Sequence, residues 1–166
     1  MARRVFFSFH YDEDIWRVNQ IRNMGVTRDW ETMPFLDHAS WEAVKRKGDA
    51  AVKAWIDRQL DGSGVTVVLI GSQTANRKYV KYEIQESHRR GNGLLGIYIN
   101  GLKNQEGQTS GKGRNPFDDF TAQVDGWFGP TTKRFSEIYP TYDWVWNSGY
   151  QNINGWIEEA AKKAGR

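Results

Sequence analysis

The chain has 166 residues, and its content of 39% hydrophobic and 14% aromatic residues predicts a folded globular protein rather than a disordered segment. Its 23 basic and 20 acidic residues leave a formal charge of +3, an excess too small to indicate nucleic-acid binding. The absence of cysteine excludes a disulfide framework, a thiolate nucleophile and thiolate metal ligands.

Hydrophobic runs in the sequence are short. None approaches the roughly 18 apolar residues of a membrane span, and the run near the start, Val5 to Phe9, is too short for the core of a signal peptide. We therefore expect a cytoplasmic protein without a membrane partner, folded as one domain over residues 1–166.

The first forty residues predict a strand, a helix and a second strand. Arg4 to Phe9 is a β-branched and aromatic run typical of a buried strand. Asp12 to Gly25 carries apolar residues at helical steps, with acidic residues in its first turn and glycine at its end. Met33 to Ala39 is predicted as a strand at the edge of the sheet, because Pro34 cannot donate a ladder hydrogen bond.

The middle of the chain alternates helices and strands. Ser40 to Leu60 is predicted as a second helix, with Trp41 and Trp55 on its apolar stripe. The remaining elements in this region are the strand Val65 to Gly71, the helix Asn76 to Arg90 and the strand Leu94 to Asn100. Both strands are almost continuously apolar, as strands covered on two faces usually are.

The last third of the sequence is less regular. Gly101 to Gly129 is polar and glycine-rich, and we interpret it as a long loop insertion that is functional or binds a partner. A fifth strand is predicted near Arg134 to Ile138, and a final helix near Ile153 to Ala164. Most of the eight tryptophans are assigned to the core.

Strands that alternate with helices predict an α/β fold, a flavodoxin-like doubly wound and mainly parallel sheet with helices on both faces. Ligands of such sheets bind at the carboxyl ends of the strands, near the point where the strand order reverses. The candidate site residues therefore follow the predicted strands: Ser8, Phe9, His10, Tyr11, Asp12, Asp37, His38, Ser72, Gln73 and Thr74.

Glu83 is the strongest candidate for chemistry. Val80 and Ile84 are four residues apart and face the sheet together, so Tyr79 and Glu83 form a row at the edge of the buried stripe. We expect Glu83 to be partly buried and to project into the crevice. The alternative is an exposed glutamate paired with Arg77, Lys81 or Ser87.

Two other motifs are weak. The stretch "GQTSGKG" lacks the spacing of a Walker A loop, since three residues separate its first glycines and Lys112 is followed by Gly113. The three histidines lie on separate elements without ligand spacing, so we expect no metal site.

Five stretches of the sequence carry a resemblance to a known family. They are "RVFFSFHYDED", "FLDHASWE", "VTVVLIGSQTANRKYVKYEI", "GKGRNPFD" and "YDWVWNSGYQNINGWI". In this order, over nearly the whole chain, they closely resemble the TIR-like proteins of the Thoeris ThsB family, which act in bacterial antiphage defence.

The resemblance implies an activity. Members of the family cleave the nicotinamide–ribose bond of NAD and cyclise the product into a cyclic ADP-ribose isomer after phage infection, and that molecule activates a partner NADase effector. The family's catalytic glutamate matches Glu83. Phe9, Tyr11 and Tyr79 are then expected to line the cleft, His10 and Arg77 to approach the pyrophosphate, and Ser8 and Asp37 to contact substrate.

Two departures from related TIR sequences leave another function open. Tyr79 stands where relatives have tryptophan, and "MPFLDHASWE" replaces the basic box of ordinary TIR domains. Because many TIR enzymes complete their sites on assembly, a homo-oligomer is a further expectation, as is a phage protein that triggers activity. The alternative is a non-catalytic adaptor or phage sensor that acts through Gly101 to Gly129.

Overall fold

A central parallel sheet organises the molecule. The computed structural model describes residues 3–24, 30–33 and 38–166. Five strands lie in the order β2-β1-β3-β4-β7, and all four pairings between neighbours are parallel. Their bounds are β1 (Arg3–Ser8), β2 (Trp30–Thr32), β3 (Val65–Ile70), β4 (Gly93–Tyr98) and β7 (Thr141–Asp143). The predicted flavodoxin-like α/β architecture is confirmed.

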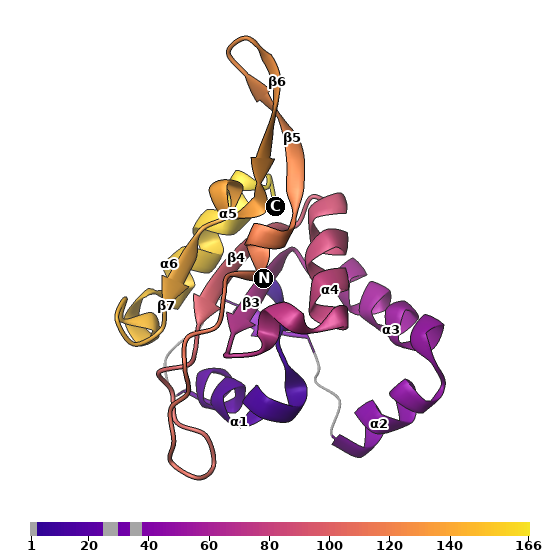
Figure 1. The fold of residues 1–166 in the computed structure, drawn as a ribbon, viewed down its shortest axis with the longest axis vertical. Helices are drawn as coiled ribbons and strands as arrows, with labels where there is room; N and C mark the ends of the chain where they lie inside the picture. The colour runs from indigo at the N-terminus through magenta and orange to yellow at the C-terminus, as the bar shows by residue number, and fades with distance from the viewer. Residues whose placement is uncertain (1–2, 25–29, 34–37) are drawn as a thin grey trace.

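Helices cover both faces of the sheet (Figure 1). On one face α1 (Tyr11–Arg22) and α6 (Gly149–Lys163) share a buried core with alternate strand residues such as Phe7 and Val67. On the other face α3 (Asp49–Asp61) packs on Phe6, and α4 (Lys78–Arg89) packs on Val68. The strands therefore bury side chains on both faces, as their nearly continuous apolar sequences predict. None of the helices in the described ranges is long and apolar enough to cross a bilayer.

The predicted helix from Ser40 to Leu60 is wrong as a single element. The chain forms α2 (His38–Arg46) and then α3, separated by Lys47 and Gly48. Gly48 has a φ of 104°, a conformation that side chains with a Cβ rarely adopt, so the turn depends on glycine. The break allows α2 to leave the axis of α3.

The strands predicted at Met33 to Ala39 and at Arg134 to Ile138 do not lie at those positions in the structure. The edge strand is β2, which ends at Thr32 before the predicted start at Met33; residues 34–37 lie outside the described part of the chain. The predicted strand at Arg134 to Ile138 is instead occupied by the short helix α5 (Phe135–Ile138), where the Glu137 carboxylate accepts a hydrogen bond of 2.8 Å from the Arg134 amide. The outer strand beside β4 is β7.

A hairpin extends from the body of the molecule (Figure 1). The region predicted as a loop, Gly101 to Gly129, contains the 3₁₀ turn η2 (Pro116–Asp119) and β5 (Thr121–Gly126), and β5 pairs antiparallel with β6 (Gly129–Arg134). Trp127 and Phe128 at its tip are 94% and 99% exposed. Trp16 and Trp146 are exposed too, whereas the other five of the eight tryptophans are buried in the core or packed against it, as predicted for most of them.

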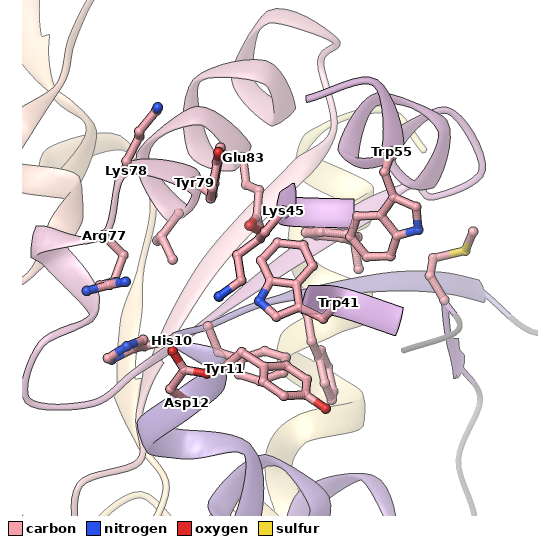
Figure 2. Close-up of a pocket in the computed structure, with 15 residues that line it drawn as sticks. His10, Tyr11, Asp12, Trp41, Lys45, Trp55, Arg77, Lys78, Tyr79 and Glu83 are labelled. Atoms are coloured by element: carbon pink, nitrogen blue, oxygen red, sulfur yellow. The ribbon is translucent and has the colours of Figure 1, made fainter. Parts of the chain in front are cut away.

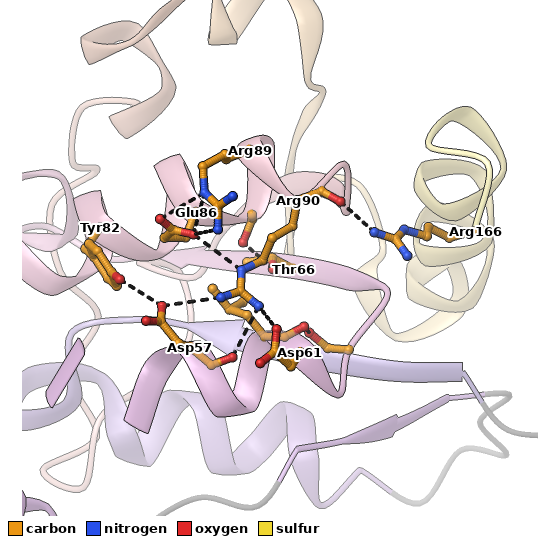
Figure 3. Close-up of polar contacts among 11 residues, drawn as sticks. Asp57, Asp61, Thr66, Tyr82, Glu86, Arg89, Arg90 and Arg166 are labelled. Carbon is orange, nitrogen blue, oxygen red and sulfur yellow. Dashed lines mark hydrogen bonds and ion pairs between the residues drawn. The ribbon is translucent and has the colours of Figure 1, made fainter. Parts of the chain in front are cut away.

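An arginine cluster joins α3 to α4 (Figure 3). The Arg90 guanidinium, 3.5 Å from the Asp57 carboxylate, also pairs with Asp61 and with Glu86. The Tyr82 hydroxyl donates a hydrogen bond of 2.7 Å to the same Asp57. Because the Arg90 side chain is only 16% exposed, water screens these charges less than on an open surface. The cluster fixes the spacing of the two helices that form one wall of the site described below.

Gly93 is expected to tolerate no side chain. A Cβ added there would lie 2.8 Å from the Ala160 carbonyl oxygen of α6, and a backbone atom cannot move aside without separating α6 from β4. We expect Gly93→Ala to lower the free energy of unfolding by about 1–3 kcal/mol, measured by urea denaturation. Gly155→Ala on α6 is the control, since nothing lies within 4 Å of its added Cβ. Equal effects of the two substitutions would contradict the prediction.

Candidate functional site

A cavity of about 270 Å³ lies between the end of β1 and the helices α2, α3 and α4 (Figure 2). Aromatic rings form most of its wall: Phe9, Tyr11, Trp41, Trp55 and Tyr79. Charged and titratable side chains also line it: His10, Asp12, Lys45, Arg77, Lys78 and Glu83. The combination of an apolar wall and a few convergent polar groups is typical of small-molecule sites.

Glu83 is the buried acid of this cavity. Its helix α4 packs Val80 and Ile84 into the core, which carries the neighbouring Glu83 to 7% exposure. Its Oε2 atom has no hydrogen-bond partner within the described residues. The pairing with Arg77, Lys81 or Ser87 that the sequence left open is not observed, and the Ser87 hydroxyl instead lies 2.7 Å from Thr66 Oγ1.

Burial controls the charge of Glu83. Loss of contact with water raises the pKa of its carboxyl from 4.5 to about 8, while the nearby Ser8 hydroxyl lowers the pKa by a smaller amount. Ser8 is fully buried at the end of β1, yet neither Ser8 Oγ nor Glu83 Oε2 has a partner with the geometry of a hydrogen bond in the described chain. Glu83 is therefore mostly protonated near neutral pH in the free protein.

The predicted site residues that line this cavity are Phe9, His10, Tyr11, Asp12, Arg77, Tyr79 and Glu83, whereas Ser8, Ser72, Gln73 and Thr74 do not line it. Phe9 and Tyr11 stack with ring centroids 6.0 Å apart, and His10 lies between them in the chain, 3.3 Å from Glu13 Oε2. Tyr79 donates a hydrogen bond of 3.1 Å to the Asp49 carboxylate.

Arg77 lines the mouth of the cavity and is exposed, and no described side chain forms an ion pair with it. Asp37 lies outside the described residues. Ser72 does not line the cavity. Its hydroxyl donates a hydrogen bond of 2.9 Å to Glu13 on α1. Across residues 3–24, 30–33 and 38–166 there is no group of three or more histidine, aspartate or glutamate side chains that could hold a metal ion.

Sequence reasoning missed the contribution of α2 and α3. Trp41, Lys45 and Trp55 all line the cavity. Trp41 and Trp55 were assigned to the core because residues 40–60 read as one continuous helix. The spacing of four between Trp41 and Lys45 places both on one face of α2, and Gly48 is the signal that could have separated this face from α3.

The free energy of unfolding should fall as the pH rises toward 8, because of the protonation of Glu83. Glu83 keeps its proton in the folded protein up to a pKa of about 8 but loses it near 4.5 when unfolded. Because the folded state binds the extra proton between these values, the stabilisation is complete below pH 4.5 and is lost as the pH rises to about 8. We expect the melting temperature of Glu83→Gln, which cannot ionise, to fall less than that of the wild type across this range.

The control for this measurement is Glu86→Gln on the same helix. Arg89 holds the pKa of Glu86 below its usual value, so that residue is ionised in both states over the same pH range. The pH dependence of its melting temperature should match the wild type. Parallel curves for the wild type and Glu83→Gln would contradict the assignment of a raised pKa to Glu83.

Residues 6–104, more than half of the chain, match the family model described as the TIR-like domain of Thoeris protein ThsB. The chain belongs to this family. A ThsB relative from Bacillus cereus (strain MSX-D12), named "Putative cyclic ADP-D-ribose synthase ThsB1", is 37% identical over 191 aligned residues, which cover 95% of this chain and 100% of the relative. The resemblance seen in the sequence is confirmed, and the cavity with Glu83 lies inside the matched region.

Proposed function

We propose that this ThsB-family chain cleaves the nicotinamide–ribose bond of NAD and closes the product into a cyclic ADP-ribose isomer. The observation that carries the proposal is Glu83, a buried carboxyl in an aromatic cavity that forms no salt bridge with any side chain in the described part of the chain. The name of the Bacillus cereus relative supports the cyclic product. The proposal uses NAD as substrate and needs no metal.

Glu83 can serve this reaction through charge alone. The bond between ribose C1 and the pyridinium nitrogen breaks with its electron pair going to nitrogen, so nicotinamide leaves neutral and needs no acid. Positive charge develops on the ribose as an oxocarbenium-like centre. A carboxylate fixed against it in a cavity with little water stabilises that charge far more than it would in solution.

Binding of the substrate shifts the Glu83 carboxyl to its ionised form. The free carboxyl is mostly neutral near pH 7, because burial raises its pKa to about 8. The cationic nicotinamide ring brings a positive charge next to it, which favours the carboxylate and lowers the pKa. Binding of NAD is thus coupled to the release of a proton, and the acid becomes charged only when the substrate is in place.

The second half of the reaction is a ring closure. A hydroxyl elsewhere in the same molecule attacks ribose C1 from within the cavity, forms the new C–O bond, and passes its proton to the Glu83 carboxylate. Water must stay out, since attack by water gives linear ADP-ribose. The aromatic rings of Phe9, Tyr11 and Tyr79 provide such a wall.

The cellular role follows the same proposal. The cyclic product acts in the cytoplasm as a messenger that activates a partner NADase effector, after a phage component has triggered synthesis. Assembly of several copies is a further part of the proposal, because many TIR sites are completed by a neighbour.

A non-catalytic adaptor or phage sensor is the second candidate. The hairpin of β5 and β6 favours it, since Trp127 and Phe128 project at its tip almost fully exposed. Exposed aromatic side chains are enriched where proteins contact partners. An adaptor does not require the buried acid of the cavity, however, and no hydrogen-bond partner for Glu83 Oε2 is found among the residues that the structure describes.

The deciding experiment incubates the purified protein with NAD, alone and with lysate from phage-infected cells, and follows small molecules by mass spectrometry. We expect nicotinamide and a cyclic ADP-ribose isomer in equal amounts. If nicotinamide is released in neither condition, the enzymatic proposal fails and the adaptor reading stands.

A further inference from the structure

The helix α2 presents two functional groups to the cavity. Trp41 and Lys45 are one helical turn apart and both line it, while Val44 between them packs against the core formed with Phe6 and Ile56 (Figure 2). The packing of Val44 sets the orientation of the face that carries Trp41 and Lys45. None of the residues that the resemblance assigns to catalysis or substrate contact lies on this helix.

Trp41 is the centre of the aromatic wall. Its ring lies 6.4 Å from Tyr11, 5.9 Å from Trp55 and 6.2 Å from Tyr79, the last in an edge-to-face arrangement. Three neighbours from three different elements hold it in one position. A large flat ring held in this way at a cavity wall is suited to pack against a planar base.

The ammonium of Lys45 is available to bind an anionic group of a ligand. Its ammonium lies 5.7 Å from the centre of the Trp41 ring and 2.7 Å from Glu42 Oε1, in an i,i+3 pair whose side chains are both about one-third exposed. Pairs of this kind contribute little to stability, so the ammonium can turn to a stronger anion at small cost. Lys78 is less available, because Asp49 holds it at 2.6 Å.

Arg77 provides a second available cation. It lines the same cavity, is exposed, and has no ion-pair partner within the described residues. Figure 2 shows the side chains of Lys45 and Arg77 extending toward the part of the cavity beside His10. Two cations at the mouth of a cavity match the two negative charges of a diphosphate.

The position of Glu83 sets the direction of the ligand. In the function proposed above, on which this inference rests, the nicotinamide-bearing ribose lies against Glu83 on α4. The diphosphate and adenosine must then extend to another part of the cavity. Lys45 and Arg77 supply cations for the first, and Trp41 supplies a flat ring for the second.

We propose that α2 forms the subsite for the adenosine diphosphate half of NAD, with Lys45 binding the diphosphate and Trp41 packing against the base. In this arrangement Trp41 is a positioning residue for ring closure. It holds the base folded back toward ribose C1, so that an atom of the same molecule reaches C1 before water does.

The test combines binding, kinetics and product analysis. Lys45→Gln should raise the KM for NAD about tenfold with little change in kcat, and should weaken the binding of ADP by a similar factor in calorimetry, since it removes one charge-assisted contact. Cleavage of nicotinamide mononucleotide, which lacks the second phosphate and the base, should change much less. Lys47→Gln, at the exposed residue that directly follows α2, is the matched control.

Trp41 is tested by the ratio of cyclic to linear product. Trp41→Ala should shift the product from the cyclic isomer to linear ADP-ribose, because the base is no longer held over C1, while Trp41→Phe should keep most of the cyclic product. Trp146→Ala, at a tryptophan 86% exposed and outside the cavity, is the control. If Trp41→Ala does not fold, Trp41→Phe and Lys45→Gln still decide the question.

The outcomes separate this inference from the proposed function. Wild-type NAD cleavage with the same KM, ADP affinity and product ratio in the Lys45 and Trp41 variants would overturn the subsite and leave the function intact. Absence of NAD cleavage by the wild type would overturn the function. The ADP titration with wild type and Lys45→Gln would still test the subsite in that case, and equal affinities would reject it.

Discussion

Glu83→Gln is expected to reduce the release of nicotinamide from NAD at least about 100-fold while the protein remains folded. Glutamine has nearly the same shape as the protonated acid that burial favours in the free protein, so the cavity accepts it. What it lacks is the negative charge that forms when the cationic substrate binds. The measurement is nicotinamide release at saturating NAD, with thermal unfolding to confirm the fold.

Glu86→Gln on α4 is the matched control for this loss of activity. Glu86 lies one turn away, pairs with Arg89 at 2.8 Å and with Arg90 at 3.3 Å, and does not line the cavity. Its replacement should leave turnover close to the wild type. Turnover by Glu83→Gln at the wild-type rate would show that this acid does not stabilise the ribosyl charge.

Arg17→Met is expected to cause the largest loss of stability. Arg17 is 1% exposed on α1, and its guanidinium donates hydrogen bonds to Asp14 Oδ1 at 2.9 Å, the Leu102 carbonyl at 2.8 Å and the Gln108 carbonyl at 3.0 Å. Methionine fills similar space but leaves the buried Asp14 without its cation. Removing one partner of a buried pair costs about 3–5 kcal/mol. Thermal and urea unfolding measure the loss.

The double variant separates the charge from the packing. Burial already raises the pKa of Asp14, and Arg17 is the main group that opposes this shift. Arg17→Met combined with Asp14→Leu removes both charges and should recover most of the lost stability. Arg58→Met, at an exposed position of α3, should have little effect. A double variant no more stable than Arg17→Met would show that the charge of Asp14 is not the cause.

Strands and helices with a strong apolar pattern were predictable from the sequence. β1, β3 and β4 begin and end within two residues of their predicted bounds, and α1, α4 and α6 lie where the helical spacing indicated. The three-residue strands β2 and β7 were not, because strands this short are defined by pairing with β1 and β4 rather than by their own residues. The hairpin also gave little signal, since its strands are largely exposed and lack an apolar face.

The candidate site was predictable in part, where the apolar spacing of a helix indicated which side chains are buried. Helical spacing placed Glu83 at the margin of the buried stripe of α4, and the structure gives it 7% exposure. Spacing could not show that its Oε2 atom lacks a hydrogen-bond partner among the described residues, because that depends on side chains from other elements. Trp41 and Lys45 were missed because their position follows from the turn at Gly48.

The turn at Gly48 separates α3, which packs into the core, from α2, which lines the cavity. Val52, Ile56 and Leu60 of α3 are fully or almost fully buried in the core, whereas the described side chains of α2 that pack against it, Trp41 and Val44, are partly buried. Substitutions in α2 therefore carry a smaller cost in folding than those in α3. A substitution at Trp41 or Lys45 therefore alters the wall of the cavity while the sheet and its core stay the same.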